Sequence, residues 1–224
     1  MTSPSATTKI TAIVPALNEE PTIADVVRAL KSAPSVSEVI VVDDGSTDRT
    51  AAVAREAGAD KVISLPTRSG KGNALCQGVS ATDAPVLLFC DADFLGFGPE
   101  HAEALIAPVV SGQAMMCVGL RDRGPAVIAL ERLMPWIGGE RALRREVFES
   151  VPPELLDGFR VELALNASCR AKDLPVASVI SWGVGQRRKM QKRGWLRGFV
   201  DYSGMVWDMT QAVVALRLRR AELR

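Results

Sequence analysis

Short β-branched runs alternate with helical patterns through the first half of this chain, and this alternation constrains the fold more than any other feature. The runs predict strands at 9–16, 38–44, 61–65 and 85–90, and the stretches between them predict helices at 21–33, 47–57 and 71–79. Strands that alternate with helices form βαβ units with right-handed crossovers. We therefore expect an α/β fold, with a mostly parallel sheet flanked by helices.

The second half of the chain is less regular. The pattern predicts strands at 114–120 and 176–182, a strand or a helix start at 141–148, a helical stripe at 161–173 and a long helix from about 196 to 220. We find no internal repeat and no linker long enough to separate two domains. A single domain over 1–224 is therefore expected, with segments 8–98, 99–195 and 196–224, the last a basic C-terminal helix.

Charge is distributed unevenly along the chain, although the formal net charge is only +1. Ten basic and three acidic residues lie between Gln186 and Arg224, so this segment carries +7 and the preceding chain carries −6. Such segregation suggests that the two ends handle different chemistry. Because no overall positive field surrounds the chain, we do not expect it to bind nucleic acid.

The cysteines and the N-terminal residues indicate the compartment. Cys76, Cys90, Cys117 and Cys169 lie far apart without a CxxC pair, which argues against a zinc site and against a secreted disulfide scaffold. The first nine residues lack the apolar core of a signal peptide, and no stretch of about 20 mostly apolar residues could span a bilayer. We therefore expect a cytoplasmic protein with reduced thiols.

Polar clusters follow three of the predicted strands, beginning at Pro15, Asp43 and Asp91. In parallel sheets, ligands collect at the carboxyl ends of the strands. Asp91 and Asp93 are two carboxylates one residue apart, which can bind one divalent cation and the phosphates attached to it. Acids at strand ends are also common without any metal role, so this pair alone is weak evidence.

The cluster that begins at Asp43 has two interpretations. Ser46 or Thr47 could cap the following helix, with Asp48 favourable to the helix dipole. A cap does not explain two adjacent acids at the end of a buried strand. Because an unpaired buried carboxylate is costly, we expect Asp43 or Asp44 to meet a base or a ribose.

Two further segments precede predicted helices. Asn18 or Glu19 fits the start of the first helix, as a cap. In segment 68–73, glycines flank Lys71 before a helix, which offers free backbone N–H groups and one cation to a phosphate. The segment is not a Walker loop, because GxxxxGK[ST] is absent.

Taken together, four ordered motifs resemble the family 2 glycosyltransferases, which have the GT-A fold with a Rossmann-like sheet. The motifs are IVPALNEE (13–20), VVDDGSTD (41–48), RSGKGNAL (68–75) and DAD (91–93). The resemblance implies a nucleotide-diphospho-sugar donor, a UDP- or GDP-sugar, and Mg²⁺ or Mn²⁺ as cofactor. It assigns the metal to Asp91 and Asp93. It assigns the donor to Pro15, Ala16, Leu17, Glu19, Asp44, Ser46, Gly70, Lys71, Asp91 and Ala92.

Shorter stretches of the second half resemble the acceptor segments of glucosyl-3-phosphoglycerate synthases, namely GGER (138–141), GFRVE (158–162) and GQRRK (185–189). This resemblance implies that Glu162 faces the sugar. It also implies that an acidic acceptor is bound by Gly138, Gly139, Arg141 and Arg188. The chain departs from the pattern, because the histidine that neighbours the metal there has no counterpart, and Arg187 stands near its place. We expect His101 to be a surface or packing residue.

The related polyprenyl-phosphate sugar transferases share the front half and place arginines near the acceptor phosphate. Arg121 and the 187–193 cluster would suit that role equally. The apolar residues of the predicted C-terminal helix are spread around it too evenly to reserve one face for lipid. We therefore expect this helix to serve packing or a homodimer, with weak membrane association as the alternative.

The expected function is sugar transfer, in which segment 8–98 binds the nucleotide-diphospho-sugar and segment 99–195 binds a small anionic acceptor, such as a phosphoglycerate-like molecule. A cation at Asp91 and Asp93 would help the nucleoside diphosphate to leave, and Arg187 or Arg188 would neutralise it. Glu162 is the expected general base if the reaction inverts the sugar. The alternatives are a polyprenyl-phosphate sugar transferase at the membrane surface and a non-catalytic nucleotide-sugar-binding protein.

Overall fold

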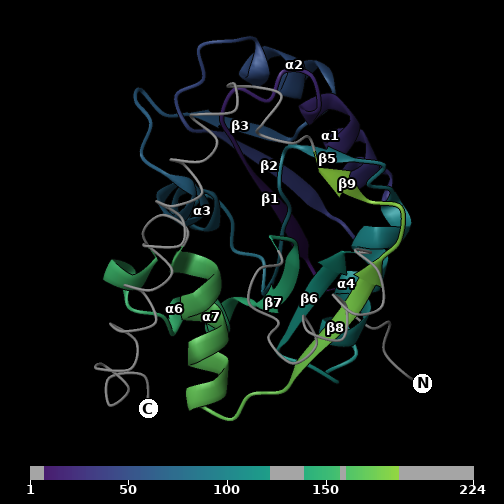
Figure 1. The fold of residues 1–224 in the computed structure, drawn as a ribbon, viewed down its shortest axis with the longest axis vertical. Helices are drawn as coiled ribbons and strands as arrows, with labels where there is room; N and C mark the ends of the chain where they lie inside the picture. The colour runs from purple at the N-terminus through teal and green to yellow at the C-terminus, as the bar shows by residue number, and fades with distance from the viewer. Residues whose placement is uncertain (1–7, 122–138, 157–159, 187–224) are drawn as a thin grey trace, which may run out of the picture.

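A seven-stranded sheet with helices on both faces forms the centre of the molecule (Figure 1). This computed structural model describes residues 8–121, 139–156 and 160–186. In spatial order the strands are β3 (Lys61–Ser64), β2 (Glu38–Asp43), β1 (Ile10–Ala16), β4 (Val86–Phe89), β7 (Arg141–Arg144), β6 (Met116–Arg121) and β8 (Val176–Ser181). The expected α/β class, with a mostly parallel sheet flanked by helices, is confirmed.

The four strands from the first half of the chain are parallel. β1 pairs with β2 on one side and with β4 on the other, and β3 pairs with the far side of β2. The connections run through α1 (Ile23–Ser32), α2 (Thr50–Glu56) and α3 (Lys71–Ser80). β1 and β2 are buried along nearly their whole length, which explains their continuous apolar runs. Because these strands are parallel, their carboxyl ends meet at one edge of the sheet.

One strand of the second half reverses direction. β7 is antiparallel to both β4 and β6, whereas β8 is parallel to β6. The stretch 141–148, which predicts a strand or a helix, holds both, because α6 (Arg145–Glu149) follows β7 directly. The predicted strands at 114–120 and 176–182 are β6 and β8, and the predicted helical stripe is α7 (Arg160–Ala171). The expected helix at 196–220 lies outside the described residues.

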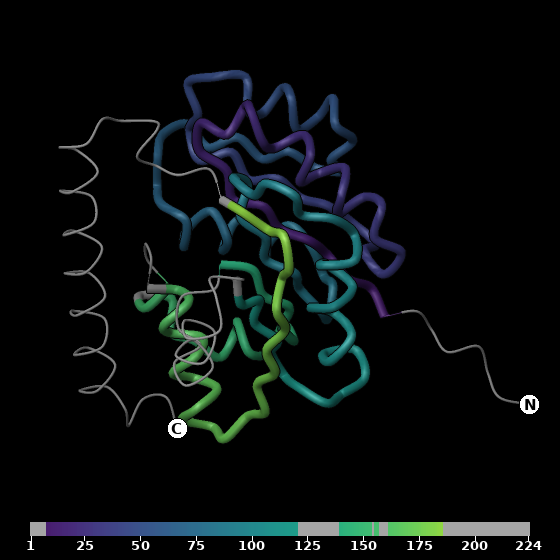
Figure 2. Tube along the Cα trace, turned by 45° about the vertical axis from the view of Figure 1, so that its right-hand side comes forward, coloured from purple at the N-terminus to yellow at the C-terminus, as the bar shows by residue number. Residues whose placement is uncertain are grey.

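Helices cover both faces of the sheet (Figures 1 and 2), and an apolar core lies on each face. On one face, α1 and α4 (Pro99–Val110) contribute buried leucines such as Leu30 and Leu105. On the other face, α3 and α7 contribute Leu75 and Leu165, together with side chains of α6. Burying each such side chain contributes roughly 1.5–3 kcal/mol. The packed sheet is therefore a rigid support for the loops at its carboxyl edge.

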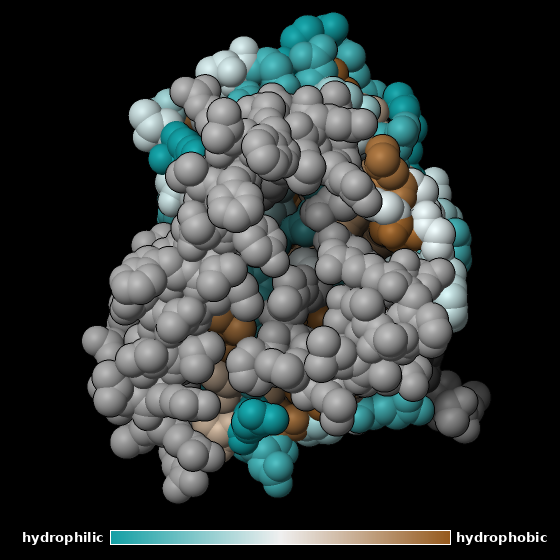
Figure 3. Space-filling model, viewed as in Figure 1, coloured by the Kyte–Doolittle hydropathy of each residue, from teal (hydrophilic) through white to brown (hydrophobic). Residues whose placement is uncertain are grey.

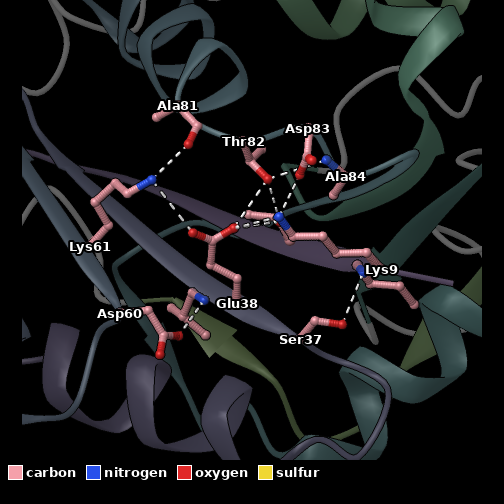
Figure 4. Close-up of polar contacts among 12 residues, drawn as sticks. Lys9, Ser37, Glu38, Asp60, Lys61, Ala81, Thr82, Asp83 and Ala84 are labelled. Carbon is pink, nitrogen blue, oxygen red and sulfur yellow. Dashed lines mark hydrogen bonds and ion pairs between the residues drawn. The ribbon is translucent and has the colours of Figure 1, made fainter. Parts of the chain in front are cut away.

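A polar cluster closes the opposite, amino-terminal edge of the sheet (Figure 4). Glu38, at the start of β2, accepts hydrogen bonds from the hydroxyls of Thr11 and Thr82, both at 3.1 Å. The Lys61 ammonium lies 3.6 Å from the other carboxylate oxygen of Glu38 and donates to the carbonyl of Ala81 at 2.7 Å. These contacts tie β1, β2, β3 and the end of α3 together, away from the polar clusters that the sequence singles out.

The helix expected at 47–57 begins later, at Thr50. The Asn18 amide donates to the Ser46 hydroxyl at 2.9 Å, and the Thr47 amide donates to Asn18 Oδ1, also at 2.9 Å. Ser46 and Thr47 therefore bind the preceding loop and do not cap α2, which corrects the expectation. Asp48 Oδ1 accepts from the Thr50 amide at 3.0 Å and so orders the first turn.

A separate two-stranded sheet lies beside the main one. β5 (Phe94–Leu95) pairs antiparallel with β9 (Gly185–Gln186), so the residues that follow Asp93 lie next to the end of the described chain. The space-filling view shows apolar surface over these two strands, where Leu95 is 49% exposed (Figure 3). Among the helices that the structure describes, none is both long and apolar enough to cross a membrane.

Candidate active site

The predicted donor and metal residues gather at the carboxyl edge of the parallel strands. β1, β2 and β4 end at Ala16, Asp43 and Phe89, and the three polar clusters lie at these ends. The loop that leads into α3 joins them, because its backbone contacts the end of β2. The clusters therefore converge, as ligand sites in parallel sheets do.

The β1–α1 and β2–α2 loops are bound to each other. Besides the Asn18 contacts to Ser46 and Thr47, the Glu19 amide donates to the Thr50 hydroxyl at 2.8 Å. Asn18 adopts a left-handed backbone with φ of 55°, which asparagine tolerates better than most residues. The predicted donor residues of the first loop, Pro15, Ala16, Leu17 and Glu19, therefore lie in a segment whose shape depends on the second loop.

Asp44 organises the loop before α3. Its Oδ1 accepts from both the amide and the hydroxyl of Ser69 at 2.7 Å, and its Oδ2 accepts from the Gly70 amide at 2.9 Å. Asp43 Oδ1 likewise accepts from the Ser46 amide at 3.1 Å. The sequence predicts a base or ribose as the partner of one of these buried acids. The structure shows that hydrogen bonds within the chain already stabilise both carboxylates.

Two glycines let this loop come close. Gly45 has φ of +75°, and a Cβ on it would lie 2.8 Å from the Arg68 amide nitrogen, so only glycine fits there without strain. Gly70 precedes α3 with φ of +96°, also in the left-handed region. Lys71, the first residue of α3, therefore follows a backbone segment that is fixed by the contacts of this loop.

Lys71 links the DAD motif to α7. Its ammonium donates to Asp91 Oδ1 at 2.6 Å and to Glu162 Oε1 at 2.7 Å. Burial alone would lower the pKa of Lys71, but the charges of Asp91 and Glu162 outweigh it and raise the pKa. Lys71 is therefore a permanent cation between two carboxylates. The sequence predicts a place for it near the base or ribose and does not anticipate this bridge.

Asp91 and Asp93 follow β4 with the buried Ala92 between them, and Asp93 is itself only 7% exposed. A glycine lies against Asp91, because a Cβ on Gly139 would come within 2.1 Å of its Oδ2. Gly139 therefore makes room for the carboxylate at the predicted metal position. A role for Gly139 toward an acceptor stays a prediction.

Glu162 lies in the first turn of α7 and is 9% exposed. Its Oε1 is bound by Lys71, whereas its Oε2 is buried without a hydrogen-bond partner among the residues that the structure describes. A buried carboxylate oxygen in this state usually has a partner that arrives with a ligand or water. The side chain therefore suits contact with a hydroxyl of a bound substrate.

Arg141 supports the same turn. Its Nη1 donates to the Glu162 carbonyl at 3.3 Å and contacts Met116 Sδ at 3.9 Å. The side chain is 1% exposed, and burial lowers the pKa of the guanidinium against the opposing charges of Glu162 and Asp91. The sequence predicts that Arg141 binds an acceptor. In this arrangement the guanidinium is enclosed, so direct contact with an acceptor would require the packing around it to open.

Glu140 is a buried acidic residue to which the sequence motifs assign no role. Glu140, between Gly139 and Arg141, is fully buried, and a Cβ on Gly119 would lie 2.2 Å from its Cγ. Burial and the charge of Glu140 both raise the pKa of Cys90. Glu140 directly follows Gly139, which lies against Asp91, so its backbone is next to the DAD motif. In the sequence, its position between two glycines and a short strand is the feature that distinguishes this acid.

Carboxylates gather at the predicted metal position. Asp91 and Asp93 follow β4, and Lys71 joins the carboxylate of Asp91 to that of Glu162. Carboxylate oxygens are the hard ligands that a divalent cation such as Mg²⁺ or Mn²⁺ prefers. Within the described ranges, no three acidic, histidine or cysteine side chains form a ready-made metal cage. Two carboxylates suffice for Mg²⁺ or Mn²⁺ when waters and substrate phosphates complete the coordination, so the residues present fit such an ion.

The chain matches a known protein family. The family model "Glycosyl transferase family 2" matches residues 11–157, more than half of the chain. The chain belongs to this family. The resemblance carried by the four motifs is thereby confirmed, and the family match includes all of them.

Two curated proteins of known name are similar to this chain. The glucosyl-3-phosphoglycerate synthase of Mycobacterium tuberculosis is 30% identical over 194 residues, which cover 70% of this chain and 59% of the relative. The chain therefore spans less than two thirds of the length of this curated relative. The 4,4'-diaponeurosporenoate glycosyltransferase of Staphylococcus haemolyticus is 41% identical over 107 residues, which cover 45% of this chain and 28% of that protein.

Solved structures confirm the expected GT-A fold. The crystal structure of the Mycobacterium tuberculosis synthase with Mn²⁺, UDP and glucosyl-3-phosphoglycerate superposes with a TM-score of 0.75 at 29% identity, covering 96% of this chain and 80% of that chain. The same synthase with Mn²⁺, UDP-glucose and phosphoglyceric acid gives a TM-score of 0.70 at 30% identity, covering 82% and 73%.

The remaining predicted residues of this family 2 glycosyltransferase are Gly138, Arg121, Arg187, Arg188 and His101. Gly138, Arg187 and Arg188 lie outside the described residues, and of Arg121 the structure describes the backbone, as the last residue of β6. His101 is bound to the Gly98 amide at 2.9 Å and to the Trp182 carbonyl at 2.9 Å. It therefore packs α4 against the turn before β9, as a residue with a structural role does.

Proposed function

We propose that this protein transfers a hexosyl group from a nucleotide-diphospho-sugar to a small anionic acceptor, with Mg²⁺ or Mn²⁺ as cofactor. The observation that carries the proposal is the contact of Lys71 with both Asp91 and Glu162. This contact joins the DAD motif, on the donor side, to Glu162 of α7, whose second carboxylate oxygen has no partner among the described residues. A donor diphosphate and an acceptor hydroxyl could meet between these two groups.

The donor side uses the three loops at the carboxyl edge. We propose that the segments around Leu17, Ser46 and Gly70 surround the nucleoside, because hydrogen bonds already hold these segments in one arrangement. Asp91 and Asp93 would hold the cation, which when bound supplies Lewis-acid neutralisation of the diphosphate. Arg187 and Arg188, which follow β9 in sequence, remain the proposed cations for the leaving group, since β9 pairs with the strand after Asp93.

Glu162 is the proposed general base. For an inverting reaction, a carboxylate must accept the proton of the acceptor hydroxyl as that oxygen attacks the sugar. Glu162 Oε2 is buried and has no partner among the described residues, while Lys71 and Arg141 hold the side chain and the backbone of this residue. The oxygen is thus held in place for a proton transfer.

The acceptor is proposed to carry a phosphate or a carboxylate. The support is the basic sequence that follows β9, together with the similarity to a synthase whose crystal structures hold UDP-glucose and phosphoglyceric acid. UDP-glucose and 3-phosphoglycerate are accordingly the first pair to test. We also propose that the protein acts in the cytoplasm, because its four cysteines are free thiols, as in a reducing compartment.

A transfer assay tests the proposed function. The whole chain is incubated with UDP-glucose or GDP-glucose, Mn²⁺, and either 3-phosphoglycerate, glycerol 3-phosphate or glycerol, and the product is identified by mass spectrometry. We expect transfer to a phosphate-bearing acceptor and little to glycerol. Faster transfer to glycerol would contradict the anionic acceptor. Donor binding without hydrolysis or transfer to any acceptor would favour a non-catalytic nucleotide-sugar-binding protein.

A further inference from the structure

The Lys71 ammonium joins the donor side and the acceptor side of the site. It lies 2.6 Å from Asp91 Oδ1 and 2.7 Å from Glu162 Oε1. The three side chains are 20%, 17% and 11% exposed, so solvent and salt screen these contacts far less than those of a surface ion pair. Lys71 therefore neutralises Asp91 firmly in this arrangement.

Asp91 cannot easily escape this contact. Its Oδ2 lies so close to Gly139 that a Cβ there would come within 2.1 Å. The carboxylate is thus confined between a glycine and an ammonium. A divalent cation that binds Asp91 must approach within a few ångströms of the positive charge of Lys71, and like charges at this distance repel strongly in a partly buried site.

We propose that Lys71 competes with the metal for Asp91, so that the metal binds tightly only together with the nucleoside diphosphate. The inference rests on the proposed function, since it takes Asp91 as a metal ligand. Without a donor, the ammonium occupies the charge-neutralising position next to Asp91. When the diphosphate arrives, its negative oxygens offset the added positive charge, and one site can hold both cations.

Glu162 is a second carboxylate to which the Lys71 ammonium can donate a hydrogen bond. Because one Nζ makes both contacts, Lys71 can loosen its hold on Asp91 and still donate to Glu162 Oε1. Arg141 holds the backbone of Glu162 at the same time, through its carbonyl. Donor loading would thus leave Lys71 as a positioning residue for Glu162, which couples the filling of the donor site to the placement of the proposed base.

Mn²⁺ binding in the absence of any nucleotide tests the competition. We compare wild type with Lys71→Met, which keeps an unbranched side chain without the charge, and with Lys71→Arg, which keeps the charge. Lys31→Met is the matched control, because Lys31 lies 2.7 Å from Asp60 in an exposed ion pair outside the site. Free Mn²⁺ is measured by electron paramagnetic resonance. We expect Lys71→Met to bind Mn²⁺ at least tenfold more tightly than wild type, and both other variants to stay within about twofold.

Several results overturn the inference. The inference is wrong if Lys71→Met binds Mn²⁺ as tightly as wild type or more weakly. It is also wrong if Lys31→Met gains as much Mn²⁺ affinity as Lys71→Met. If circular dichroism shows that Lys71→Met does not fold, Mn²⁺ binding to the wild-type protein is measured with and without saturating UDP. An increase in Mn²⁺ affinity of less than tenfold on adding UDP would also overturn the inference. The absence of sugar transfer to every acceptor, in contrast, counts against the proposed function alone, because the Mn²⁺ comparison needs neither sugar nor acceptor.

Discussion

The carboxylate of Asp44 accepts a hydrogen bond from the Gly70 amide at 2.9 Å, across 26 residues of the chain. This bond and the two from Ser69 fix the loop that leads into α3. Lys71 follows directly, so the end of β2 determines where the bridging ammonium begins. The loop before α3 therefore holds in place the charged centre of the site, which consists of Lys71, Asp91 and Glu162.

Replacing Asp44 by asparagine should loosen this loop. An amide keeps one acceptor oxygen and turns an NH₂ group toward backbone donors, so at least one charge-assisted hydrogen bond is lost, at a cost of about 1–3 kcal/mol. We expect lower stability in urea unfolding and a donor affinity reduced roughly tenfold in calorimetry. The control is Asp25→Asn, at an exposed site on α1. Equal effects of the two substitutions would contradict this role of Asp44.

Gly139→Ala should displace the Asp91 carboxylate, because the added Cβ would lie 2.1 Å from its Oδ2. We expect metal-dependent donor binding to fall by at least tenfold, with a smaller effect on donor binding in EDTA. Gly185→Ala is the matched control, since its Cβ would meet only an ordinary contact at 3.8 Å. Calorimetry that finds wild-type metal dependence in Gly139→Ala would show that this close contact is not needed.

Glu162→Gln should slow turnover while the donor still binds. The amide keeps the size of the side chain but cannot take up a proton, and general-base catalysis contributes typically 10²–10⁴-fold. We expect kcat to fall by at least 100-fold and the donor Kd to change by less than about fivefold. Glu149→Gln, on the exposed side of α6, serves as the control. A modest loss of kcat would leave Glu162 with a positioning role only.

Acid should weaken the link between the first two loops. Burial would raise the pKa of Asp48, but hydrogen bonds from Thr50 and from the Glu20 amide outweigh it and lower the pKa below 3.8. The stability that this carboxylate contributes is therefore present above the unfolded-state pKa and is lost as the pH falls through the lower folded-state value. The stability difference between wild type and Asp48→Asn in urea should shrink from about pH 6 to about pH 3, and a constant difference would contradict the argument.

The sequence carries the parallel half of the fold because that information is local. Continuous apolar runs and glycines predict each strand and helix of this half, and polar clusters predict the edge where we propose that the donor binds. The sequence places the start of α2 too early, since Ser46 and Thr47 bind Asn18 in another loop. Such a partner, 28 or 29 residues away, leaves no trace in a helical pattern.

The contacts among Lys71, Asp91 and Glu162 could not be predicted from the sequence. Lys71 and Glu162 are 91 residues apart, and they meet only because β7 reverses direction and leads into α7 on the same face as α3. Arg141, two residues after Gly139, is predicted from the sequence to bind an anionic acceptor, and this stays a prediction, whereas its buried position and its contacts with the Glu162 carbonyl and Met116 could be seen only in the structure. Residue type indicates chemistry, whereas burial decides what a side chain can reach.

The most direct test of the central claim is donor binding to Asp93→Ala, measured by calorimetry with a UDP-sugar in the presence and absence of Mg²⁺. If Asp91 and Asp93 hold the metal that neutralises the diphosphate, wild type should bind the donor much more tightly with Mg²⁺. The variant should lose this dependence while its circular dichroism stays that of a folded protein. Asp83→Asn, an exposed acid at the far end of the sheet, should behave as wild type. Unchanged donor affinity of Asp93→Ala in Mg²⁺ would contradict the metal site and with it the proposed mechanism.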